Sequence, residues 1–194
     1  TKSIDMIEGM GFECFTFRKL GLEIGSNEAS IYRYFENKHK LLLYLTNWYW
    51  GWMEYRLMIG LANIDSSKDR LRIAIRTLTK EVSEDSNFSH INEVKLHRIV
   101  IAESAKAYLT KEVDQENNDG AFKGYKKLVT NISDIILEIK NSYKYSHMLI
   151  STVVEGAHLQ RFFADHLPTL TDVVKGKDAI TDFYTELVFK AIDE

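Results

Sequence analysis

Residues 11–42 read GFECFTFRKLGLEIGSNEASIYRYFENKHKLL, and this stretch decides the fold that we expect. Thr16 can cap a short helix, because its hydroxyl accepts hydrogen bonds from the free N–H groups at a helix start. Gly25 suits the turn that ends this helix. A second short helix follows over about residues 28–35. Two short helices joined by a three-residue turn predict a helix-turn-helix, whose second helix enters the major groove of DNA.

The second short helix has an inner and an outer face. Ile31 and Phe35 are four residues apart and point into the core, so Ala29 and Arg33 point away from it. Small, polar and cationic side chains on an outer face can reach base edges and phosphates. We therefore expect DNA contacts from Thr16, Asn27, Glu28, Ala29, Ser30, Tyr32, Arg33, Tyr34 and Lys38.

The same stretch resembles the N-terminal domain of the TetR (tetracycline-repressor) family of bacterial transcriptional regulators. Gly11-Phe12 matches the pair that closes the family's first helix, and Thr16 matches the hydroxyl residue that opens the second. Residues 31–35, followed by Lys38 and Leu41-Leu42, match the recognition helix and the start of the fourth helix. Residues 11–42 align without a gap.

This resemblance implies a DNA-binding domain over residues 1–45 and a helical ligand-binding and dimerisation domain over residues 46–194. It implies a cytoplasmic regulator, a repressor, that binds a pseudo-palindromic double-stranded operator as a homodimer. Thr1 is not a methionine and lies where a helix is already under way, so we expect further residues before it.

The whole chain predicts an all-α fold of about nine helices. It has 194 residues, a single proline and apolar residues at helical spacing. The acidic segment 112–120 is expected to be a linker. Outside the helix-turn-helix, helices are expected up to Gly11 and over about residues 37–59, 66–82, 91–108, 122–140, 146–166 and 180–191.

Composition excludes several classes of protein. The net charge of −3 does not indicate nucleic-acid binding by itself. Cys14 is the only cysteine, so no intrachain disulfide is possible, and we expect a buried thiol in a reducing cytosol. The longest uncharged apolar run, residues 41–53, is too short to span a membrane. We expect no metal and no cofactor.

Residues 146–166 are apolar almost all round, so we expect the chain's own domain to cover one side and a second copy to cover another. A two-fold dimer would pair this helix and the last helix with their symmetry mates. The expected interface residues are Leu149, Val153, Phe163, Tyr184 and Val188.

An apolar small molecule is the expected effector, because aromatic residues recur and no arginine cluster or glycine-rich loop is present to hold phosphate. It would bind in a cavity of the C-terminal domain and act through the helix over residues 37–59. The expected lining residues are Trp48, Trp52, Tyr55, Phe88, His97, Glu103, Tyr108, Phe122, Tyr125, His158 and Phe162.

Two other functions stay open. Glu-x-x-His occurs at residues 36–39 and 155–158, as in helical di-iron enzymes, although the first copy lies inside the helix-turn-helix. A helical interaction module that binds no DNA is the second alternative, because residues 1–61 carry no net charge. Tyr32 and Tyr34 could also brace the following helix instead of contacting DNA.

Overall fold

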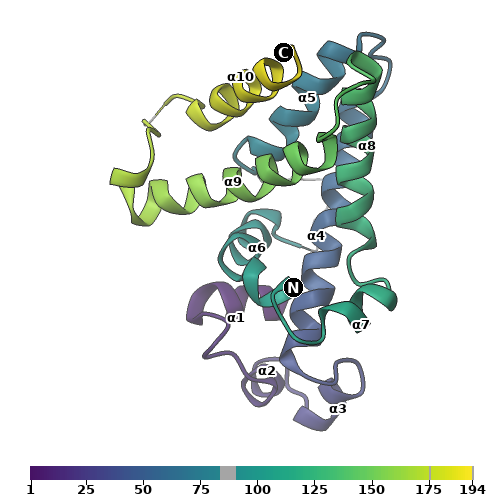
Figure 1. The fold of residues 1–194 in the computed structure, drawn as a ribbon. Coiled ribbons are helices and arrows are strands. Elements are labelled where there is room, and N and C mark those ends of the chain that lie inside the picture. The colour runs from purple at the N-terminus through teal and green to yellow at the C-terminus, as the bar shows by residue number, and fades with distance from the viewer. Residues whose placement is uncertain (84–90, 175, 194) are drawn as a thin grey trace. The chain divides into compact units, whose positions relative to one another are not determined.

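The computed structural model describes residues 1–83, 91–174 and 176–193. Within them it contains ten α-helices, one 3-10 helix and no strand, which confirms the expected all-α fold. No helix within these residues is long and apolar enough to cross a membrane. The α-helices are α1 (Lys2–Met10), α2 (Phe17–Glu23), α3 (Glu28–Tyr32), α4 (Lys38–Leu61), α5 (Ser67–Thr79), α6 (Glu93–Tyr108), α7 (Val113–Asn118), α8 (Lys123–Ile139), α9 (Ser146–His166) and α10 (Ala179–Asp193) (Figure 1).

The chain folds into two compact units. The first combines residues 1–49 with residues 82–122, and the second combines residues 50–81 with residues 123–194. Helix α4 contributes its first half to the first unit and its second half to the second. The division at residue 45 that the resemblance implies therefore differs from the compact units, because α6 and α7 fold with the N-terminal segment.

Three side-chain caps start the helices of the helix-turn-helix region. Thr16 Oγ1 accepts the backbone N–H of Lys19 at 3.2 Å, at the start of α2. Asn27 Oδ1 accepts from the N–H of Ser30 at 2.8 Å, at the start of α3. Asn37 Oδ1 accepts from the N–H of Lys40 at 2.9 Å, at the start of α4. The starts of these helices are thus set by local sequence.

The turn between α2 and α3 is tight because of Gly21. A β-carbon at this position would lie 2.8 Å from the carbonyl oxygen of Ser26, closer than real β-carbon contacts allow. The N–H of Ser26 donates to the carbonyl of Gly21 at 2.8 Å, and Gly25 follows with a φ of 65°. Glycine is therefore required within α2, where the following turn packs on the helix, and favoured by the positive φ within the turn itself.

In the first unit, α1 packs against α2 and α6, and α2 packs against α3 (Figure 1). Its core includes Ile4, Ile7, Phe15, Phe17 and Leu20, all buried. In the second unit, α5 packs against α8, α9 and α10. Helix α9 spans residues 146–166, as the sequence predicts.

The segment 112–120, which the sequence predicts to be a linker, is instead partly helical. It contains the helix α7, whose Glu116 side chain is 1% exposed. The segment lacks apolar periodicity because its one buried side chain is a carboxylate, so a search for apolar spacing could not reveal it.

Candidate nucleic-acid interface

The outer face of α3 is open to solvent. Ala29 is exposed, and so are the two residues that follow the helix, Arg33 and Tyr34, the latter at 82%. Ile31 is buried on the opposite face and Phe35 is half-buried. This arrangement is the one that helical spacing predicts, and it leaves a short exposed helix with one free guanidinium.

Several of the expected contact residues also have structural roles. The caps Thr16 and Asn27 use their side-chain oxygens on backbone N–H groups, and the hydroxyl of Ser30 donates to Asn27 Oδ1 at 2.8 Å. Tyr32 is 50% exposed, but its ring lies edge-on to Phe17, with 5.0 Å between centroids. Tyr32 therefore braces α3 against α2 while its outer edge stays accessible.

The sequence predicts that Lys38 holds a phosphate, and the structure gives its ammonium a different position. Lys38 Nζ donates to the carbonyl oxygens of Phe12 and Glu13 at 3.1 and 3.3 Å. It also lies 4.9 Å from the centroid of the Phe12 ring. The side chain thus ties the start of α4 to the connection between α1 and α2, which the spacing of the sequence could not show.

Arg18 is a candidate that the sequence interpretation missed. It is exposed on α2, whose buried residues include Phe17 and Leu20. Within the described part of the chain, neither Arg18 nor Arg33 makes a hydrogen bond or ion pair. The first helix of a helix-turn-helix crosses the DNA backbone, so an outward arginine on α2 is suited to phosphate contact. Marking the outward positions of residues 17–23 would have found it.

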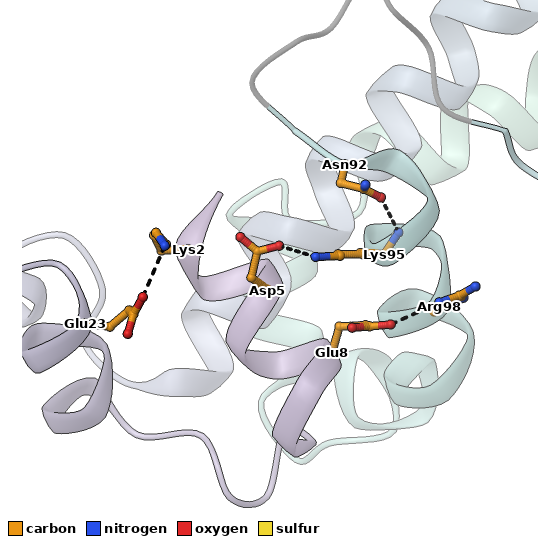
Figure 2. Close-up of polar contacts among 7 residues, drawn as sticks. All are labelled: Lys2, Asp5, Glu8, Glu23, Asn92, Lys95 and Arg98. Atoms are coloured by element: carbon orange, nitrogen blue, oxygen red, sulfur yellow. Dashed lines mark hydrogen bonds and ion pairs between the residues drawn. The ribbon is translucent and has the colours of Figure 1, made fainter.

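Ion pairs hold α1 against α6 at the edge of this unit (Figure 2). Asp5 Oδ1 lies 2.6 Å from Lys95 Nζ, and Glu8 Oε1 lies 3.0 Å from Arg98 Nη1. The hydrogen bond from Lys95 lowers the pKa of Asp5. These groups are partly exposed, so they orient the two helices more than they stabilise the fold.

A different polar centre joins α7 to α4. Glu116 Oε1 accepts from His39 Nε2 and from Lys40 Nζ, each at 2.9 Å. Burial raises the pKa of Glu116, but the hydrogen bonds from Lys40 and His39 outweigh it, so the pKa lies below the usual carboxyl value. Glu116 is therefore a buried carboxylate kept ionised by two basic neighbours.

The residues expected to line an effector cavity are divided between the units. Phe88 lies outside the described residues. Tyr49, which is not among the expected lining residues, has its hydroxyl 2.8 Å from His97 Nδ1. The first unit contains Trp48, His97, Glu103, Tyr108 and Phe122, and the second contains Trp52, Tyr55, Tyr125, His158 and Phe162.

Trp50 is the centre of an aromatic stack in the second unit, and the sequence interpretation missed it. Its ring lies 4.3 Å from that of Tyr125 and 5.8 Å from that of His158, with interplanar angles of 12° and 22°. The hydroxyl of Tyr125 donates to Glu155 Oε1 at 3.0 Å. Burial raises the pKa of Glu155. Because α4 is apolar on nearly all sides, helical spacing could not single out Trp50 among its three tryptophans.

His158 is held neutral at physiological pH. Burial, together with the positive charge of Arg161, lowers its pKa to about 4. Its side chain is 4% exposed.

The expected dimer residues are mostly interior, which corrects that assignment. Val153, Tyr184 and Val188 are buried inside the second unit, while Leu149 and Phe163 are half-buried. Gly156 of α9 leaves room for the hydroxyl of Tyr184, since a β-carbon there would overlap it. The exposed apolar side chains of α9 and α10 are instead Met148, Leu159, Phe183 and Leu187.

Two further observations concern cysteine and metal binding. Cys14, expected to be buried, is exposed. Within the described residues, no group of three or more histidine, cysteine, aspartate or glutamate side chains could hold a metal ion.

No protein-family profile matches this chain, and no curated protein matches it in sequence. The crystal structure of superantigen PfiT is similar in fold, with a TM-score of 0.60 and 14% identity. The similarity covers 97% of this chain and 91% of that one. At this identity the likeness concerns the all-helical fold alone.

Proposed function

We propose that this protein is a DNA-binding transcriptional regulator, a cytoplasmic repressor, whose α2 and α3 form the helix-turn-helix that reads an operator. The observation that carries the proposal is the outer side of α3 and of the turn after it, where Arg33 and Tyr34 are exposed while Ile31 fixes the helix from inside. Arg18 on α2 supplies a second unengaged guanidinium. Base contacts from α3 and phosphate contacts from α2 are the division of roles that this motif uses.

The test is fluorescence anisotropy with a labelled duplex taken from upstream of the protein's own coding region, titrated over a salt series. Affinity should fall linearly with salt on logarithmic axes. Arg33→Ala should weaken binding by about tenfold, or ~1.4 kcal/mol. Arg76→Ala on α5 is the matched control, because Arg76 is exposed in the second unit.

Equal binding by all three proteins would remove α3 from the DNA interface. Absence of binding at low salt would favour the alternative, a helical interaction module that binds no DNA.

We also propose a homodimer, whose interface residues differ from those that the sequence predicts. Exposed Met148, Leu159 and Phe183 on α9 and α10 form apolar surface that a two-fold contact would cover. Phe183→Glu should convert the dimer to a monomer in light scattering, whereas Asp182→Glu, one position away, should leave it unchanged. A parent protein that is already monomeric at micromolar concentration would contradict the dimer.

The effector is proposed to be an apolar small molecule that acts through α4, because that helix continues from the first unit into the second. Trp52 is 4% exposed, with Arg56 4.8 Å over its ring. Apolar compounds are to be screened for release of the duplex, and each hit repeated on Trp52→Phe. Release that is unchanged in the variant would remove Trp52 from the effector site.

A further inference from the structure

Few cations of the proposed DNA-binding segment are available to DNA. Residues 1–49 contain six lysine and arginine residues and six aspartate and glutamate residues. Four of the six cations have their charged groups engaged by the protein itself: Lys2 by Glu23, Lys19 by the Cys14 carbonyl, Lys38 by two carbonyls, and Lys40 by Glu116. The release of one more cation would therefore change phosphate binding measurably.

Lys40 is an engaged cation that lies beside the segment following α3. It occupies the first turn of α4, where Asn37 caps the helix by accepting its N–H. Its side chain lines an open hollow of about 480 Å³ together with Tyr34 and Glu36, which lie in the segment between α3 and α4. The side chain is 37% exposed, so it is not sealed from solvent.

The partner of Lys40 is buried and comes from a distant part of the sequence. Glu116 is 1% exposed, and its Oε1 lies 2.9 Å from Lys40 Nζ. The hydrogen bond to Glu116 raises the pKa of Lys40, and the charges of Glu36 and Asp119 act in the same direction. Glu116 Oε2 has no hydrogen-bond partner within the described residues. Among the described residues, the carboxylate thus has His39 and Lys40 as its hydrogen-bond partners.

We propose that Glu116 on α7 is an internal counter-charge that occupies Lys40 in place of a DNA phosphate. A carboxylate oxygen at 2.9 Å from an ammonium uses the same charge-assisted hydrogen bond that a phosphate oxygen would accept. While the pair is intact, Lys40 releases few counterions on DNA binding, and its charge is withheld. The inference rests on the proposed function, because it assumes that this face approaches DNA.

The test compares Glu116→Gln with the parent and with the double variant Glu116→Gln/Lys40→Met. Glutamine keeps the shape of the side chain and can still accept a hydrogen bond, so the fold should persist, as checked by circular dichroism. DNA affinity is measured over a salt series at one fixed pH for all proteins.

Glu116→Gln should bind DNA more tightly and steepen the salt dependence by about 0.9 in log–log slope, the value for one added phosphate contact. Its advantage over the parent then grows about eightfold for each tenfold drop in salt. The double variant should return to the parental slope. Asp114→Asn is the control, because it removes one exposed acid of the same helix and should leave the slope unchanged.

A second measurement does not depend on DNA. Acetylation of lysines, followed by peptide mass spectrometry, should label Lys40 more slowly than exposed Lys68 in the parent and faster in Glu116→Gln. Equal labelling of Lys40 in both proteins would overturn the ion pair itself. Faster labelling with an unchanged salt slope would overturn the counter-charge and leave the proposed function intact. If no variant binds the duplex at low salt, the proposed function fails, and the counter-charge fails with it.

Discussion

Glu116 in the first unit and His158 in the second are both buried titratable residues, yet their charge states differ. Glu116 stays ionised because Lys40 and His39 donate to it at 2.9 Å. His158 lies against the ring of Trp50, and burial with the nearby charge of Arg161 keeps it neutral, with a pKa of about 4. Burial disfavours charge in both places, so the neighbouring groups decide the protonation state.

The comparison also separates two kinds of stability. The His158 centre depends on apolar and aromatic packing, which requires close fit and no charge. The Glu116 centre depends on charge-assisted hydrogen bonds, whose loss leaves basic groups that solvent can reach on one side. We therefore expect substitutions at the His158 centre to lower the free energy of unfolding more than substitutions at the Glu116 centre. Substitutions at exposed ion pairs should lower it least.

Trp50→Ala should have the largest effect. The side chain is 2% exposed and stacks on Tyr125 and His158, so its removal should lower the free energy of unfolding by about 3–5 kcal/mol. Urea denaturation followed by circular dichroism measures the loss. Met58→Ala on the same helix is the control, since Met58 is 60% exposed and should change stability by about 0.5 kcal/mol or less.

The pH dependence of His158 comes next. Its pKa is depressed from 6.5 to about 4 on folding, so the unfolded chain binds more protons as pH falls below 6.5. The free energy of unfolding should fall by about 3 kcal/mol between these pH values because of this residue. In His158→Gln, the free energy of unfolding should not show this part of the fall with pH. His147→Gln, at an exposed histidine of the same helix, should show the same fall as the parent. Identical pH profiles for all three proteins would contradict a neutral buried imidazole.

Glu116→Ala should cost less, about 2 kcal/mol at neutral pH. The lowered pKa of Glu116 means that its stabilisation is present above the unfolded value of 4.5 and disappears as pH falls through the folded value. The difference in the free energy of unfolding between the parent and Glu116→Ala should therefore shrink as the pH falls. If burial of the charge were a net cost, this difference would change in the opposite direction. Exposed Glu112→Ala is the matched control. A variant as stable as the parent at neutral pH would show that α7 needs no buried charge.

Asp5→Asn should have the smallest effect. Its pair with Lys95 is partly exposed, so the loss should be about 0.5 kcal/mol and should vanish near 1 M salt, where charges are screened within about 3 Å. Thermal melts at low and high salt measure both values. A loss as large as that of Glu116→Ala would place the α1–α6 pairs among the main stabilising contacts of this unit.

The sequence by itself determined the features whose causes are local. Side-chain caps at Thr16, Asn27 and Asn37 start α2, α3 and α4, because the cap and the N–H that it accepts lie three residues apart. The inward direction of Ile31 follows from helical geometry, and α9 ends before Pro168, which cannot continue a helix. These features need only the periodicity and chemistry of neighbouring residues.

The tertiary structure decided which surfaces meet. Glu116 pairs with Lys40 across 76 positions of sequence, and no local pattern relates an acidic segment to one lysine among many. Lys38 donates to the carbonyls of residues 12 and 13, and the hydroxyl of Tyr184 occupies the space left by Gly156. These contacts also join residues that are distant in the sequence, so no local pattern predicts them. Periodicity shows that a side chain faces inward or outward, but only packing of distant segments determines which group it contacts and whether a buried charge finds a partner.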